Sequence, residues 1–100
     1  MDLQLKKIPV SLQPYFQEYD LAALNISRDA NLIIQRTLEF GTWDEIRWLF
    51  QVYSRQRIQR FLRVYGERRL NPVTFNYWRK LLGLRHWHPA PFEKGEVWNP

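Results

Sequence analysis

The chain has 100 residues, of which 45% are hydrophobic, and it carries a formal net charge of +5 with no cysteine. This length suits one domain that can fold without covalent staples, and the missing thiols exclude a disulfide framework and cysteine chemistry. Because no apolar run is long enough to cross a membrane and none follows the basic N-terminus, we expect a cytoplasmic protein with no membrane partner.

The N-terminal part of the chain carries weak structural signals. Pro9 and Pro14 interrupt any long element in residues 1–24, since proline lacks a backbone donor. We therefore expect only two short turns before the first helix, over residues 14–19 and 20–24.

Four helices are predicted after these turns, because apolar residues recur at helical spacing in four consecutive segments. A residue suited to an N-cap precedes each segment, and a glycine follows three of them. We expect Gly41 to adopt the left-handed backbone conformation that favours glycine. The helices are predicted over residues 28–40, 43–53, 55–65 and 72–82, with N-caps at Ser27, Thr42, Ser54 and Asn71 and terminal glycines Gly41, Gly66 and Gly83.

Two of these helix starts have specific signals. Thr42 and Glu45 have the spacing of a capping box, in which each side chain accepts from the other residue's backbone N–H. Asn71 followed by Pro72 places a capping side chain before a proline at the first helical position. Residues 67–70 are predicted as a connector between the last two helices.

Together these elements predict an all-α fold, a small domain of four to five helices over residues 1–84 followed by an extended C-terminal arm over residues 85–100. The arm has three prolines and no helical periodicity, yet it keeps aromatic residues, which plain disordered tails lack. We expect the arm to dock on a partner, while Trp87 stays close to the last helix. The candidate partner-binding residues of the arm are Trp87, Phe92 and Trp98.

The charges are distributed unevenly along the chain. Residues 47–85 hold nine arginines, one lysine and one glutamate, for a net +9, whereas the other residues hold five basic and nine acidic groups, for a net −4. A segment this basic favours an anionic partner, either phosphate or a carboxylate-rich protein face. Guanidinium groups bind both bidentately, so Arg55, Arg60 and Arg63 on the outer side of the third helix are candidate partner-binding residues. The alternative is a solvated, arginine-rich surface of the kind that hot environments favour.

The third and fourth predicted helices also resemble a loose helix-turn-helix. In that arrangement the second helix enters the major groove of DNA, and neighbouring basic residues bind phosphates. Two packed helices with a charged outer side would give the same pattern, and this alternative stays open. The candidate nucleic-acid-binding residues are Arg68, Arg69, Thr74, Asn76, Arg79 and Lys80.

The sequence shows no set of residues suited to catalysis. His86 and His88 would share one side of a strand, but no cysteine or nearby acid completes a metal site. Asp44 and Glu45 are adjacent and diverge on a helix, and the isolated glycines form no phosphate-binding loop. We therefore expect a protein that is not an enzyme and that uses no metal or cofactor.

Residues 33–49 read IIQRTLEFGTWDEIRWL, and residues 70–78 and 81–83 read LNPVTFNYW and LLG. The first segment resembles the core of a small uncharacterised prokaryotic helical family, in which an Ile-Ile-x-Arg-x-Leu-x-x-Gly helix end leads into Trp-Leu and a basic, tyrosine-rich helix. The later segments match in part the family's Leu-x-x-x-Thr-x-x-Phe-Trp and Leu-Leu-Gly elements. The resemblance extends over residues 12–84.

Members of that family are often encoded beside nucleotidyltransferase-type toxins of abortive-infection systems, so the resemblance implies an antitoxin. We therefore expect a protein that neutralises a cognate toxin by direct contact. The alternative is a nucleic-acid-binding transcriptional regulator that uses the helix-turn-helix-like surface. The sequence leaves open the partner's identity, any DNA sequence that is bound, and whether the chain forms a homo-oligomer.

Overall fold

The structure is a computed structural model that describes residues 7–84. Within this range the chain forms helices and turns and contains no strand, so the predicted all-α class is confirmed. The predicted arm, with Trp87, Phe92 and Trp98, lies outside the described residues, as do His86 and His88. Backbone contacts divide the chain between Ser54 and Arg55 into two compact units, whose described parts are residues 7–54 (unit 1) and 55–84 (unit 2).

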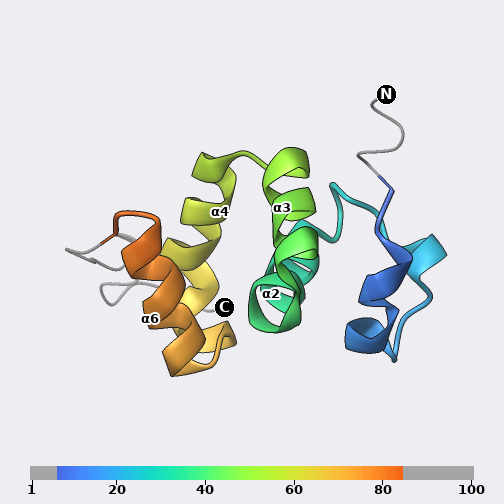
Figure 1. Ribbon diagram of the computed structural model, residues 1–100, viewed down its shortest axis with the longest axis horizontal. Helices are drawn as coiled ribbons and strands as arrows, with labels where there is room; N and C mark the ends of the chain where they lie inside the picture. The colour runs from blue at the N-terminus through green and yellow to red at the C-terminus, as the bar shows by residue number, and fades with distance from the viewer. Residues whose placement is uncertain (1–6, 85–100) are drawn as a thin grey trace. The chain divides into compact units, whose positions relative to one another are not determined.

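Unit 1 is built on two α-helices that lie side by side (Figure 1). Short 3-10 helices precede them, and the first of these packs on α2. The side chains that fill the core alternate with polar residues at helical spacing, as the sequence predicts. The elements are η1 (Val10–Phe16), η2 (Leu21–Ala23), α2 (Ala30–Phe40) and α3 (Trp43–Val52), and fully buried core residues include Leu12, Phe16, Ile33, Ile34 and Leu49.

The first turn begins earlier than predicted. Pro9 has the extended conformation of an N-cap residue, with φ −58° and ψ 136°, and Pro14 lies inside η1 rather than at its start. A helical stretch that includes both Leu12 and Phe16 buries both side chains, which a turn starting at Pro14 would not. The second turn is close to its predicted place, because the Asp20 side chain accepts a hydrogen bond from the N–H of Ala22 and caps η2.

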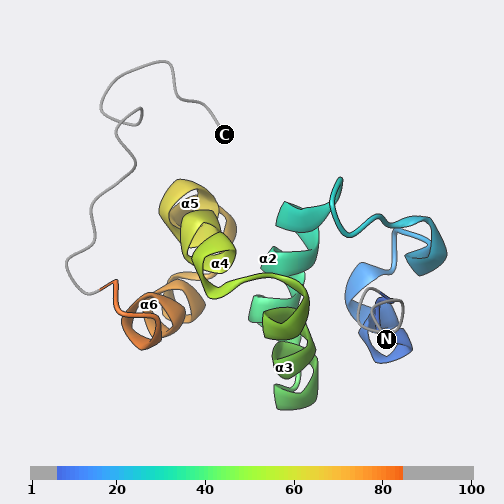
Figure 2. The ribbon, with the colours of Figure 1, turned by 90° about the horizontal axis from the view of Figure 1, so that it is seen from above.

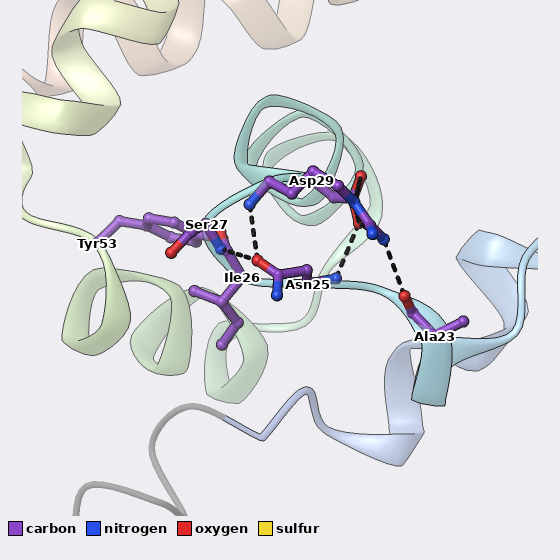
Figure 3. Close-up of polar contacts among 7 residues, drawn as sticks. Ala23, Asn25, Ile26, Ser27, Asp29 and Tyr53 are labelled. Carbon is purple, nitrogen blue, oxygen red and sulfur yellow. Dashed lines mark hydrogen bonds and ion pairs between the residues drawn. The ribbon is translucent and has the colours of Figure 1, made fainter.

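Helix α2 begins two residues later than predicted, and Ser27 is not its N-cap (Figure 3). The Asn25 side-chain oxygen accepts hydrogen bonds from the backbone N–H groups of Ser27 and Arg28, at 2.9 and 2.8 Å. The Asp29 carboxylate accepts from the N–H of Asn25 at 2.8 Å. These bonds close a local turn, and asparagine side chains compete in this way with helix formation.

The capping box at the start of α3 is confirmed. The N–H of Thr42 donates to the Glu45 carboxylate at 2.8 Å, and the N–H of Glu45 donates to the Thr42 hydroxyl at 3.3 Å. At the other end of the helix, the Tyr53 hydroxyl donates to the carbonyl of Ile26 at 2.7 Å, which ties the end of α3 to the turn before α2 (Figure 3).

The predicted left-handed conformation of Gly41 is wrong. Gly41 is extended, with φ −71° and ψ 153°. A Cβ at this position would lie 2.6 Å from the carbonyl oxygen of Thr37, in the last turn of α2. Glycine is needed here because the chain folds closely over the helix end before Thr42 starts the next helix. Among the described residues, the positive φ belongs to Gly83, at 79°, where the predicted stop is confirmed.

Unit 2 is a helix pair. Its first member is continuous from Arg55 to Arg69 and contains a π-helical turn, and α6 lies beside it (Figures 1 and 2). Gly66 does not end the helix as predicted, and residues 67–69 are helical rather than part of a connector, because Gly66 keeps helical angles of φ −57° and ψ −44°. The elements are α4 (Arg55–Phe61), η3 (Leu62–Gly66), α5 (Glu67–Arg69) and α6 (Pro72–Leu81).

Gly66 is buried because α6 passes directly over it. A Cβ at Gly66 would lie 2.9 Å from the ring of Phe75, which is itself buried. The wider π-helical turn carries the buried side of the helix from Leu62 to Gly66 and on to Leu70. Tyr65, beside this buried side, is only half-buried.

Helix α6 begins at Pro72 as predicted and ends at Leu81, one residue before the predicted end. The Asn71 side chain accepts from the N–H of Val73 at 2.9 Å, and Pro72 occupies the first turn. Phe75 and Trp78 face the core of the unit. The Gln59 side-chain amide donates to the carbonyl of Leu82 at 2.8 Å, so the C-terminal end of α6 is fastened to α4.

The two glycines at helix ends should respond differently to substitution. Gly41→Ala and Gly41→Asn should each destabilise unit 1 by about 1–3 kcal/mol, because the added Cβ overpacks against backbone. Gly83→Asn should cost much less, since asparagine tolerates positive φ and nothing lies within 4 Å of the new Cβ. Urea unfolding midpoints measure both. Better tolerance of asparagine at position 41 than at 83 would contradict the assigned geometry.

The close approach at Gly66 predicts a coupled pair of substitutions. Gly66→Ala should destabilise unit 2 by about 1–3 kcal/mol, because the buried Phe75 ring cannot swing away. Phe75→Leu should also destabilise the unit, but the double variant should be more stable than the sum of the two losses predicts. The measurement is a double-mutant cycle of unfolding free energies, and strict additivity would show that the two side chains do not meet.

Candidate functional site

Most of the positive charge of the described chain belongs to unit 2. Residues 55–84 contain eight basic residues and one acidic residue, which gives a net +7, while residues 7–54 contain four basic and six acidic residues, which gives a net −2. The ion pairs of Arg28 with Asp29, Arg36 with Glu18 and Arg47 with Asp44 all lie in unit 1. The field around unit 2 therefore favours an anionic partner.

The three arginines predicted to bind a partner are exposed. Arg55 and Arg60 lie on α4, and Arg63 lies on η3. Arg60 and Arg63 share a side of the continuous helix that is turned away from the buried Ile58, whereas Arg55 lies in the first turn of α4. Within residues 7–84 none of the three is paired with a carboxylate, so their guanidinium groups are open to a ligand there.

The residues predicted to bind nucleic acid are not equally available. Arg69 lies over the ring of Tyr65, with its guanidinium carbon 4.8 Å from the ring centroid. Arg79 is half-buried and donates to the carbonyl of Leu84 at 3.1 Å and to the Asn76 side chain at 3.3 Å, so it helps to hold the end of α6. The other candidates differ in exposure: Arg68, Asn76 and Lys80 are exposed, and Thr74 is half-buried.

The structure adds a feature that the sequence reasoning missed, an apolar stripe on the outward side of α6. Val73, Tyr77 and Leu81 are 77%, 47% and 53% exposed. They recur at every fourth residue, opposite the buried Phe75 and Trp78. This second apolar repeat is visible in the sequence, but helical spacing alone does not show which of the two repeats is buried. We call the stripe, with the exposed polar residues Asn76 and Lys80 that share its side of the helix, the α6 face.

Unit 1 contains a shallow hollow between η1 and the end of α2. The Tyr15 and Phe40 rings are stacked at one wall, with centroids 5.7 Å apart. Arg36 and Glu18 form a bidentate ion pair at 2.6 and 3.0 Å, and Arg36 also donates to the carbonyl of Tyr15 at 2.8 Å. The hollow measures about 310 Å³ and is lined by Pro14, Tyr15, Gln17, Glu18, Arg36 and Phe40.

Hydrogen bonds from the Arg36 guanidinium lower the pKa of the Glu18 carboxyl from 4.5 to about 2. The arginine also lies over the rings of Phe16 and Tyr19, at 5.5 and 5.7 Å from their centroids. Both charges of the hollow are committed to each other and to the backbone. The pair therefore serves to fasten η1 to α2.

In the part of the chain from residue 7 to residue 84, no three histidine, aspartate or glutamate side chains gather as a metal site would require. None of the helices in this part is long and apolar enough to cross a membrane.

A family model matches residues 12–62, just over half of the chain. The chain belongs to the DUF6922 family, a family of unknown function. The matched segment starts in η1 and ends just after α4, so it contains Arg55 and Arg60 but not Arg63 or the α6 face. No curated protein and no solved structure matches the chain.

The ion pair in unit 1 predicts a pH dependence of stability. Because the folded pKa of Glu18 is depressed, the pair stabilises the fold above about pH 4.5, and this contribution is lost as the pH falls toward about 2. In the Glu18→Gln variant, the urea unfolding midpoint should therefore fall less than in the unaltered chain as the pH is lowered from about 4.5 to about 2. Glu67→Gln, which removes an exposed carboxylate from unit 2, is the control and should leave the fall unchanged. Equal pH profiles for Glu18→Gln and the unaltered chain would contradict the assignment.

Proposed function

We propose that the protein is a binding module, without enzymatic activity of its own, that holds an acidic protein partner through unit 2. The observation that carries the proposal is the set of exposed arginines on α4 and η3 that no carboxylate neutralises within the described residues. Charge of one sign on a folded surface steers an oppositely charged partner and sets specificity. Among such partners, the resemblance found in the sequence points to a toxin enzyme, which the module would neutralise by direct contact.

The arginine chemistry suits this role. A guanidinium offers planar paired donors that match a carboxylate, and it is less strongly hydrated than an ammonium group. Arginines are also frequent among the residues that dominate the binding energy of protein interfaces. The continuous helix from Arg55 to Arg69 holds its arginines on one rigid element, which lowers the entropy lost on binding.

Nucleic acid is the second candidate partner, and one observation favours it. Helix α6 is capped by Asn71 and is separated by two residues from the helix Arg55–Arg69 of the same unit. Its side chains Asn76 and Lys80 are exposed. A recognition helix in a DNA major groove uses side chains of this kind for base edges and phosphates. The protein would then act as a transcriptional regulator.

Charge reversal separates the two partners. The variant Arg55→Glu, Arg60→Glu, Arg63→Glu is co-expressed with the neighbouring gene product, and size-exclusion chromatography should show loss of the complex that the unaltered chain forms. The matched control, Lys7→Glu, Arg28→Glu, Arg47→Glu, changes the net charge equally with exposed residues of unit 1 and should keep the complex. Circular dichroism melting checks that both variants fold.

The same variants decide the nucleic-acid alternative. If unit 2 binds DNA, the logarithm of the affinity of the unaltered chain for a duplex should fall with the logarithm of salt concentration by about 0.9 per phosphate contact. The proposal expects no such steep dependence and only weak duplex binding. Retention of the protein complex by the arginine variant would refute the proposed role of these arginines.

A further inference from the structure

We propose that the α6 face is the docking surface for an amphipathic helix of the partner, one whose apolar stripe is flanked by carboxylates. The inference deepens the proposed function, since it names the kind of partner segment that unit 2 takes. It concerns Val73, Tyr77 and Leu81 rather than the arginines, and it can fail while the arginine surface still binds.

The geometry of the stripe fits a helix. Val73, Tyr77 and Leu81 stand one turn apart, so their side chains span about 12 Å along α6 at 1.5 Å per residue. The opposite side of α6 is occupied by the core of the unit, through Phe75 and Trp78. An exposed row at this spacing is the complement of the apolar row on an amphipathic helix, and such rows pack ridge into groove.

Tyr77 is the anchor of the face. Its ring meets the ring of the buried Trp78 edge-on, with centroids 5.1 Å apart and an interplanar angle of 86°. This contact orients the tyrosine before any partner arrives, so little side-chain entropy is lost on binding. Aromatic residues held in this way are frequent among interface residues that dominate the binding energy.

The positive charge around the stripe determines which side chains are favoured beside the apolar row of the partner helix. Lys80 lies on the α6 face itself, and unit 2 as a whole carries a net +7 over its described residues. The screening length at physiological salt is about 8 Å, so a helix lying on the α6 face is within reach of the Lys80 charge. Carboxylates beside the apolar row are therefore favoured. A second copy that docked through its own α6 face would bring the same positive charge and would be repelled.

The apolar stripe argues against nucleic acid on this face. The floor of the major groove presents hydrogen-bond donors and acceptors, with only the thymine methyl group as an apolar contact. Three consecutive turns of α6 instead present Val73, Tyr77 and Leu81 to solvent. A duplex would cover these side chains without giving them apolar partners, whereas an amphipathic helix would bury them.

The experiment uses the full chain, labelled with ¹⁵N, and three designed helical peptides of about four turns. The first carries a leucine row flanked by glutamates, the second the same row flanked by lysines, and the third the residues of the first in scrambled order. We expect the first peptide to bind at least about tenfold more tightly than either other peptide, a difference of ~1.4 kcal/mol. Amide shift changes should centre on α6.

Substitutions of the stripe residues test whether the peptide binds there. Tyr77→Ala with Leu81→Ala should weaken binding of the glutamate-flanked peptide by about tenfold or more. Val73→Ser should also weaken it, whereas Val10→Ser, which alters a valine of equal exposure in unit 1, should not; the two valines are 77% and 75% exposed. Circular dichroism melting checks that every variant folds.

Several results would overturn the inference. Equal binding of the scrambled peptide would show that charge alone attracts it. Tighter binding of a DNA duplex or of anionic lipid vesicles, lost in the Tyr77 and Leu81 variant, would assign the face to those ligands. A toxin-type complex that survives this variant but not the arginine reversal would leave the proposed function standing and refute the α6 face as its docking surface.

Discussion

The close approach of α6 to the π-helical turn at Gly66 is the constraint on which unit 2 depends. With no side chain at this position, the Phe75 ring packs directly on the backbone of η3. The Gln59 side-chain amide then fastens the far end of α6 by donating a hydrogen bond to the carbonyl of Leu82. Two short helices are thereby held as one body, although a 30-residue segment has little apolar core of its own to bury.

This packing decides which side chains remain outside. Around the π-helical turn Tyr65 is half-buried, while Arg55, Arg60 and Arg63 are exposed. Packing Phe75 and Trp78 inward leaves Val73, Tyr77 and Leu81 facing solvent. Unit 2 thus combines a cationic surface with an apolar stripe, which is the pairing of features that a partner with acidic and apolar side chains would match.

The sequence predicted those features that are decided within a few residues. The capping box of Thr42 and Glu45 and the Asn71-Pro72 start involve only neighbours along the chain, and both were predicted correctly. The glycines were harder, because a glycine signals several backbone requirements. Gly83 has the positive φ of a helix stop, whereas Gly41 and Gly66 are needed for close approach, at distances that a sequence does not show.

The residues of the candidate site also differ in whether the sequence alone could predict them. Its charge could be counted from the sequence, so the exposed arginines Arg55, Arg60 and Arg63 were named in advance. The α6 face could not be predicted, because helix 72–82 has two apolar rows and only packing shows which of them is buried. In unit 1 the sequence likewise did not show that the Asn25 side chain accepts hydrogen bonds from the backbone of Ser27 and Arg28. The helix α2 therefore starts two residues after its predicted start.

The central claim is that a protein partner docks on unit 2. Hydrogen–deuterium exchange of the full chain, alone and in complex with the product of the neighbouring gene, tests this claim most directly. The account predicts that binding slows amide exchange in α6 and in the helix that carries the exposed arginines, while residues 7–54 exchange as in the free chain. Slower exchange confined to residues 7–54, with α6 unchanged, would contradict it.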